Sequence, residues 1–163
     1  MSLNDIQLNS QLVADLFPSS LIETFSASPD INPLLKHLGK NEKNILIIIS
    51  NEALPFLSDQ ELSFLTSILS ACRLSLADIA LINIFNAEES IVNQSIQKLA
   101  ATTILLFGIE PPAIGLPINF PQFQLQHFDK RTYLYSPTFK ELEKDKTLKS
   151  MLWTALKRLF ELT

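Results

Sequence analysis

The feature that most constrains the fold is an unbroken apolar run, Ile45-Leu46-Ile47-Ile48-Ile49. A mostly β-branched run without polar alternation is typical of a strand that is covered on both faces. Two similar runs follow at residues 79–85 and 102–107, with amphipathic helices predicted between them. This alternation favours right-handed parallel crossovers. The sequence therefore predicts an α/β fold, a three-layer α/β/α sandwich around a mostly parallel central sheet.

Helix starts and loops complete the expected domain. A last helix from about Asp145 should bury a leucine stripe, with Trp153 largely buried beside it. Four prolines predict an irregular loop over 109–121, and extended stretches at 122–128 and 132–135 predict a hairpin or the end of the sheet. Three helices are expected to begin with a small polar cap followed three positions later by a glutamate: Ser58 with Glu61, Asn86 with Glu89, and Thr138 with Glu141.

We divide the chain into an N-terminal helical segment, residues 1–40, and an α/β region, residues 41–163, which together make one domain overall. A polar, turn-like stretch around Gly39 to Asn44 separates the two parts. The N-terminal segment carries a short apolar stripe that ends at Pro18, formed by Leu12, Val13, Leu16 and Phe17.

Composition excludes several classes of protein. The chain has 163 residues, of which 47% are apolar and 18% charged, which is a globular rather than a disordered composition. The single cysteine, Cys72, excludes an internal disulfide and lies in an apolar run, so a buried, inert thiol is expected. No signal peptide is predicted, and the apolar runs are only strand-sized. We therefore expect a cytoplasmic protein without a membrane span.

The net charge of −4 is unevenly distributed. Residues 1–126 hold 5 basic and 12 acidic side chains, a net of −7, whereas residues 127–163 hold 8 basic and 5 acidic ones, a net of +3. Such asymmetry can mark a surface for an acidic partner or for phosphates. We favour the plainer interpretation, a solvated pair of amphipathic helices, because acidic residues are interleaved with the lysines. Unassisted DNA binding is expected to be weak.

Ligands of open α/β sheets bind at the carboxyl ends of the strands. Here those ends carry Asn51, Glu52, Asn83 and Glu110. Residues 50–58 contain no glycine, and phosphate binding at this turn needs glycines for close backbone approach. A dinucleotide or P-loop site is therefore not expected.

No complete catalytic or metal-binding set is visible. Neither His37 nor His127 has an identifiable nucleophile as a partner, and widely spaced histidines and cysteine make no metal signature. Glu52 and Glu110 could form a carboxylate pair for acid–base work. Solvated loop carboxylates are the plainer interpretation. No cofactor and no metal are expected.

Residues 44–160 resemble the uracil-DNA glycosylase-like fold and, within it, the psi subunits of bacterial DNA polymerase III, which are non-catalytic. The first similarity is the strand Ile45–Ser50, which leads through a short loop with Leu54-Pro55 into a helix. The second is the strand Ile79–Asn83, since the matching glycosylase strand ends in an asparagine that reads the target base. The third is a C-terminal pattern of spaced residues: Ser136-Pro137, Leu142, Asp145, Lys149 and Trp153.

The chain also departs from the glycosylase pattern. The loop Ser50-Asn51-Glu52-Ala53 lacks the glycine-rich, water-aiming sequence, and Tyr135 stands where glycosylases place a histidine before Ser136-Pro137. No cysteines for an iron–sulfur cluster are present. The resemblance therefore implies the scaffold of a base-excision enzyme without its chemistry.

The function we expect is that of a non-enzymatic accessory protein of DNA replication or repair, acting by protein–protein contact as psi does. Psi uses a mobile N-terminal segment and its domain surface to tie the clamp loader to a chi partner. By resemblance, residues 3–25 are the expected partner contact. One alternative is a divergent nucleobase- or nucleotide-binding module that uses the strand-end rim, and another is an enzyme of unassigned chemistry. The candidate rim comprises Asn51, Glu52, Asn83, Glu110, Tyr135 and Ser136.

Overall fold

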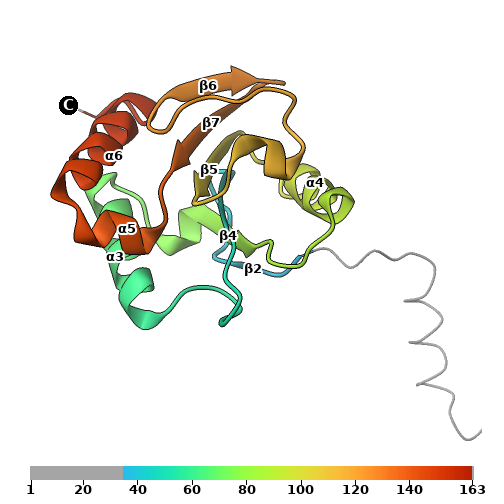
Figure 1. Cartoon of the computed structure of the whole chain (residues 1–163), viewed down its shortest axis with the longest axis horizontal. Coiled ribbons are helices and arrows are strands. Elements are labelled where there is room, and N and C mark those ends of the chain that lie inside the picture. Colours follow the sequence, from blue (N-terminus) through green and yellow to red (C-terminus); the bar gives the residue numbers. More distant parts are fainter. Residues whose placement is uncertain (1–34, 163) are drawn as a thin grey trace, which may run out of the picture. The chain divides into compact units, whose positions relative to one another are not determined.

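The computed structural model describes residues 35–162, and Figure 1 labels most of its helices and strands. Within this range the chain is a mixed α/β structure with one six-stranded sheet. The strands are β2 (His37–Leu38), β3 (Ile45–Ile49), β4 (Ile79–Asn83), β5 (Thr103–Phe107), β6 (Leu125–Phe128) and β7 (Arg131–Ser136). The helices are α3 (Asp59–Ala71), α4 (Glu89–Lys98), α5 (Phe139–Lys144) and α6 (Lys146–Leu159), with short 3-10 turns η2 (Leu76–Asp78) and η3 (Pro111–Ile114).

The sheet has the strand order β2-β4-β3-β5-β7-β6. The four central strands run parallel, and the edge strands β2 and β6 pair antiparallel with their neighbours. In the register, Ile47 of β3 lies between Leu81 of β4 and Leu105 of β5. The apolar run Ile45–Ile49 thus forms an inner strand, buried along its whole length.

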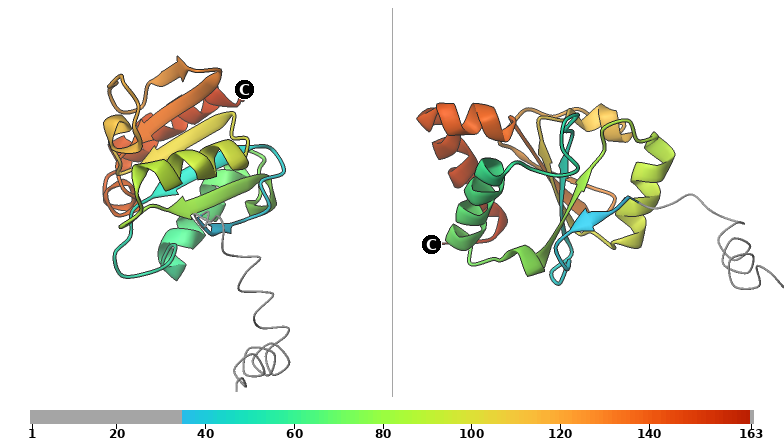
Figure 2. Two further views of the ribbon diagram at one scale, coloured as in Figure 1. Left: turned by 90° about the vertical axis from the view of Figure 1, so that its right-hand side faces the viewer. Right: turned by 90° about the horizontal axis from the view of Figure 1, so that it is seen from below.

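Helices cover both faces of the sheet, as Figure 2 shows in the view from below. Odd-numbered residues of β3, such as Ile45 and Ile47, face the core beneath α3, α5 and α6. Leu46 and Ile48 face the second core, beneath α4 and η3. A fully buried leucine or isoleucine contributes about 1.5–3 kcal/mol, so the continuous run anchors two cores at once. This explains why β3 shows no polar alternation.

Two of the three expected capping pairs are confirmed. The Ser58 hydroxyl accepts a hydrogen bond from the Glu61 amide at 3.2 Å, and the Glu61 carboxylate accepts one from the Ser58 amide at 3.1 Å. Thr138 and Glu141 form the same box at the start of α5. Asp145 caps α6 through the amide of Thr147. Each cap stabilises its helix by about 1 kcal/mol.

The third expected pair, Asn86 with Glu89, is wrong. Asn86 has a φ of 61°, so its backbone is left-handed and stands outside the helix. The helix α4 begins only at Glu89, with Glu88 at the cap position and no side-chain cap hydrogen bond. Asparagine tolerates this backbone conformation better than most residues, and here it serves the turn rather than the helix.

The sheet begins earlier than the boundary at residue 41 that the sequence suggests. His37 and Leu38, assigned there to an N-terminal helical segment, form β2 and pair with Ile82 and Leu81 of β4. The stripe Leu12, Val13, Leu16 and Phe17 lies outside the described residues.

The C-terminal half follows the expected order, with two corrections in its last helix. β6 and β7 form the predicted hairpin, and β7 also completes the sheet beside β5. α6 buries Leu152 and Leu156 as expected, but Leu148 and Leu159 of the same leucine stripe are only half-buried. Trp153, however, is only half-buried, because it lies on the flank of this stripe and not at its centre. Within residues 35–162 no helix combines the length and apolar character needed to cross a membrane.

Candidate functional site at the carboxyl ends of the strands

The strand order fixes where a ligand crevice would lie. β3 and β5 are neighbours in the sheet. The chain leaves β3 through α3 to reach β4 on one side of this pair, and it leaves β5 through η3 to reach β6 and β7 on the other side. The connections from β3 and β5 therefore diverge, and such a switch point is where open α/β sheets bind ligands. The six rim residues expected from the sequence all belong to the ends of β3, β4, β5 and β7, or to the loops that follow them.

On the β3 and β4 side, Asn51 and Asn83 are bound to each other. The Asn83 side-chain oxygen accepts a hydrogen bond from the Asn51 amide at 2.9 Å. The Asn83 side-chain nitrogen donates to the carbonyls of Asn51 at 2.9 Å and Leu54 at 3.0 Å. The same Asn83 oxygen accepts from the Phe85 amide at 3.1 Å. We call this arrangement the Asn83 clamp.

The clamp uses the full hydrogen-bonding capacity of Asn83. A primary amide offers two N–H donors and two acceptor positions on its oxygen, and all four are engaged within the chain. Asn51 is engaged similarly, accepting from the amides of Ala53 and Leu54 and donating to the Phe56 carbonyl. In this arrangement Asn83 has no donor or acceptor left with which to read a nucleobase, whereas Asn51 has one side-chain N–H without a partner among residues 35–162.

The clamp also determines what the loop presents to solvent. Asn83 bonds to the backbone of Leu54 and of Phe85, and these two side chains are 40% and 39% exposed. Among the described residues the only other large apolar side chain exposed to this degree is Met151, on α6. The sequence does not single out this pair, because Leu54 belongs to a loop motif and Phe85 ends a run that predicts a strand over residues 79–85. The available signal is an apolar side chain in the loop that follows each strand, Leu54 after β3 and Phe85 after β4.

The two acidic candidates do not form a common site. Glu52 and Glu110 are both exposed, and neither makes a side-chain hydrogen bond or ion pair within residues 35–162. Glu110 lines a shallow depression together with Tyr135, and Glu52 is not part of its lining. Asn119, Phe120, Pro121 and Gln122 complete that depression.

The Ser-Pro segment is packed against the end of β5. Ser136 is buried, and its hydroxyl donates to the neighbouring Pro137 carbonyl at 3.2 Å. The Gly108 amide donates to the Ser136 carbonyl at 2.7 Å. Gly108 has a φ of 73°, and a β-carbon there would collide with the Thr138 side chain. This glycine therefore allows close packing between β5 and the start of α5, and Ser136 does not face an open crevice.

The remaining titratable side chains do not join the rim. His127 is exposed on the edge strand β6, with its Nδ1 3.0 Å from the Thr132 hydroxyl, and His37 is exposed on β2. Burial raises the pKa of the Cys72 thiol to about 11, as expected of an inert cysteine. Over residues 35–162 no three His, Cys, Asp or Glu side chains gather as metal ligands would.

No protein-family model matches the chain, and no curated protein matches it either.

Proposed function

We propose that the protein is a non-enzymatic accessory factor of bacterial DNA replication or repair, acting in the cytoplasm through protein–protein contact. On this proposal its scaffold is a three-layer, uracil-DNA glycosylase-like sandwich of the psi type, on which the base-excision site has been converted to structural use. The proposal rests on the sequence resemblance of residues 44–160 and on the geometry of the strand ends.

The Asn83 clamp is the observation that carries the proposal. On the glycosylase pattern, the asparagine at this strand end reads the target base, which requires a free amide edge. Here both amide hydrogens and both acceptor positions of Asn83 bind the chain's own backbone. A residue that could recognise a ligand instead holds two loops in place.

The loops held by the clamp have the character of a protein-contact surface. Leu54 and Phe85 are presented to solvent by hydrogen bonds to their backbones, so little conformational entropy would be lost on docking. Aromatic side chains are over-represented at protein interfaces. We therefore assign Leu54 and Phe85 to the partner contact, in addition to the N-terminal stripe expected from the sequence.

The test is capture of partners from the source cell with the full-length protein as bait. Wild-type protein should recover components of the replication or repair machinery. The double variant Leu54→Ser with Phe85→Ser should recover less of them, because an exposed apolar contact is lost while the fold is untouched. Met151→Ser, which removes the third exposed apolar side chain, should recover as much as wild type. Recovery of metabolic enzymes alone, or of nothing above background, would overturn the proposal.

One observation favours a second candidate, a nucleobase- or nucleotide-binding module. The depression lined by Glu110, Tyr135 and Gln122 offers an aromatic side chain beside polar groups, at the carboxyl end of the sheet. Calorimetric titration with nucleosides and nucleotides tests it. Binding that is lost in both Tyr135→Ala and Glu110→Gln would replace the first proposal with this one.

A further inference from the structure

An apolar groove runs between α3 and α6, on the side of the sheet opposite α4. It encloses about 230 Å³ and is almost wholly apolar. Leu152 and Leu156 are buried, while Phe64, Ile68 and Trp153 are half-buried and therefore reach solvent. Ser67, Ala71 and Lys149 complete the lining. None of the six rim residues contributes to this groove, so it is a separate surface.

Two lysines of α6 flank the groove. The Lys149 ammonium lies 5.4 Å from the centre of the Phe64 ring, and the Lys157 ammonium lies 5.8 Å from the centre of the Trp153 ring. Lys149, Trp153 and Lys157 are spaced four residues apart and therefore share one helix face. The only ion pair in the described part of the chain joins Asp129 and Arg131, so neither lysine has a carboxylate partner there.

We propose that the groove docks an acidic segment of a partner protein, with an apolar side chain inserted between α3 and α6 and carboxylates on Lys149 and Lys157. This inference rests on the proposed function, because it names the chemistry of one contact through which such an accessory factor acts. The apolar floor supplies a pocket for an anchor, and the lysines supply charge complementarity at its edge.

A second copy of this chain fits the groove poorly. A twofold contact would place the same surface on both sides and bring the lysines of one α6 toward those of the other. The only acidic residues of α3, Asp59 and Glu61, lie in its first turn, and Glu61 is already engaged with Ser58. The groove therefore lacks carboxylates with which a copy could neutralise these lysines.

Single-stranded nucleic acid also fits less well than an acidic peptide. Sequence-tolerant binding needs open aromatic faces for base stacking and a basic track for the phosphates. Here ammonium groups already lie over the rings of Phe64 and Trp153. The α3 edge carries no lysine or arginine between residues 59 and 71, so the basic track has only one side.

Selection from a displayed library of random short peptides, with intact protein as bait, tests the proposal. Recovered peptides should be net acidic and carry an aromatic or leucine anchor. Their binding is followed by the emission of Trp153, which is the only tryptophan in the chain and lies in the groove. The double variant Lys149→Ala with Lys157→Ala should bind about tenfold more weakly, because two exposed charge pairs are lost. Lys40→Ala with Lys98→Ala, two exposed lysines elsewhere, is the matched control and should bind as wild type does.

Several results would overturn the proposal. These are recovery of neutral or basic peptides, failure to recover any, or equal binding to the wild type and the Lys149, Lys157 double variant. A larger change in Trp153 emission with oligothymidylate or with anionic lipid vesicles than with the selected peptides would assign the groove to those ligands instead.

The same variants separate this inference from the proposed function. If replication proteins are captured equally by the wild type and the Lys149, Lys157 double variant, the function stands and the groove assignment falls. If acidic peptides bind the groove but no replication or repair protein is captured, the groove assignment stands and the function falls.

Discussion

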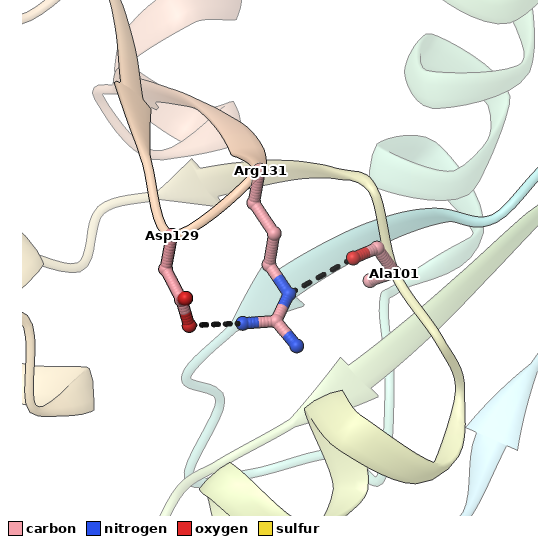
Figure 3. Close-up of polar contacts among 3 residues, drawn as sticks. All are labelled: Ala101, Asp129 and Arg131. Atoms are coloured by element: carbon pink, nitrogen blue, oxygen red, sulfur yellow. Dashed lines mark hydrogen bonds and ion pairs between the residues drawn. The ribbon is translucent and has the colours of Figure 1, made fainter.

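Arg131 donates a hydrogen bond from its Nε to the carbonyl of Ala101 at 3.0 Å, joining the start of β7 to the segment that leads into β5 (Figure 3). The same guanidinium pairs with Asp129 at 3.3 Å. Ala101 is buried, so its carbonyl would otherwise lack a partner. This contact links two strands at the amino-terminal ends of the parallel strands, whereas the Asn83 clamp links two loops at their carboxyl-terminal ends.

Replacing Arg131 should therefore cost more than replacing its ion-pair partner. We expect Arg131→Ala to lower the free energy of unfolding by about 1–3 kcal/mol, because a buried carbonyl loses its donor. Asp129 is largely exposed, and Asp129→Asn removes its charge while keeping a side chain suited to the left-handed backbone at this position (φ 52°), so it should cost below about 1 kcal/mol. Urea denaturation of both variants measures the difference. Equal losses would show that the ion pair, and not the carbonyl contact, carries the stabilisation.

The Asn83 clamp makes a similar prediction for the opposite edge. Asn83→Ala removes four hydrogen bonds from the two loops, and we expect a loss of about 1–3 kcal/mol. Hydrogen exchange at the amides of Ala53 and Leu54 should become faster. Glu52→Ala, in the same loop but without side-chain hydrogen bonds, is the control and should leave both measurements unchanged. Unaltered exchange in Asn83→Ala would mean that the clamp does not order this loop.

Two neighbouring residues of α6 should differ in the cost of truncation. Leu152 is 2% exposed and lies in the core beneath the sheet, so Leu152→Ala should cost about 3–4 kcal/mol. Trp153 is half-buried, so Trp153→Ala should cost only about 2 kcal/mol despite its larger side chain. Chemical denaturation gives both values. The reverse order would place Trp153, and not Leu152, at the centre of the helix contact.

Cys72 predicts a loss of stability at high pH. Burial raises the pKa of its thiol from 9.0 to about 11 in the folded protein. Between these values the unfolded chain releases the proton first, so the folded state binds more protons and stability falls as pH rises. Wild type should therefore lose more stability than Cys72→Ala between pH 9 and 11. Parallel losses in the two proteins would contradict the buried, protonated thiol. Thiol reagents should also modify the native protein slowly at neutral pH.

The elements that the sequence predicts well depend on local patterns. The run Ile45–Ile49 is apolar at every position, and this pattern alone indicates burial on both faces. The caps at Ser58 and Thr138 are each recognised within four residues of sequence. The start of helix α6 is predicted to within a residue for the same reason, since Asp145 and the leucine stripe both mark it. Local physical chemistry suffices for these features.

The features that the sequence does not reveal depend on contacts between distant residues. The Asn83 clamp joins Asn83 to Asn51 and Leu54, which are 32 and 29 residues away, and no local pattern around Asn83 predicts these hydrogen bonds. The two-residue strand β2 is too short for a periodic signal. It forms because β4 would otherwise be an edge strand, with backbone groups available for antiparallel pairing. The sequence places Trp153 on the flank of the leucine stripe and predicts that it is largely buried. How much of a flanking side chain is covered depends on the width of the surface packed against the helix, which no local pattern predicts.

Base excision provides the sharpest test of whether the rim retains any chemistry. The reaction needs a flipped base that is recognised, a positioned water and stabilisation of the departing base. Recognition would fall to Asn83, whose amide is fully engaged. Placement of water would fall to Glu52, which is exposed and without a partner among residues 35–162. Stabilisation of the leaving group would fall to Tyr135, half-buried on β7.

We therefore expect no excision of uracil by the purified protein. Loss of one stabilising group on such a site commonly lowers the rate by about a hundredfold or more. Here the amide of Asn83 is engaged with the backbone, and no hydrogen bond within residues 35–162 holds Glu52 in a fixed position to place a water. The measurement is a single-turnover assay on single-stranded uracil-containing DNA with protein in excess. Cleavage that persists in both Glu52→Ala and Asn83→Ala would indicate a contaminating glycosylase. Cleavage that Glu52→Ala abolishes, in a variant whose stability is unchanged, would show that the rim is an active site after all.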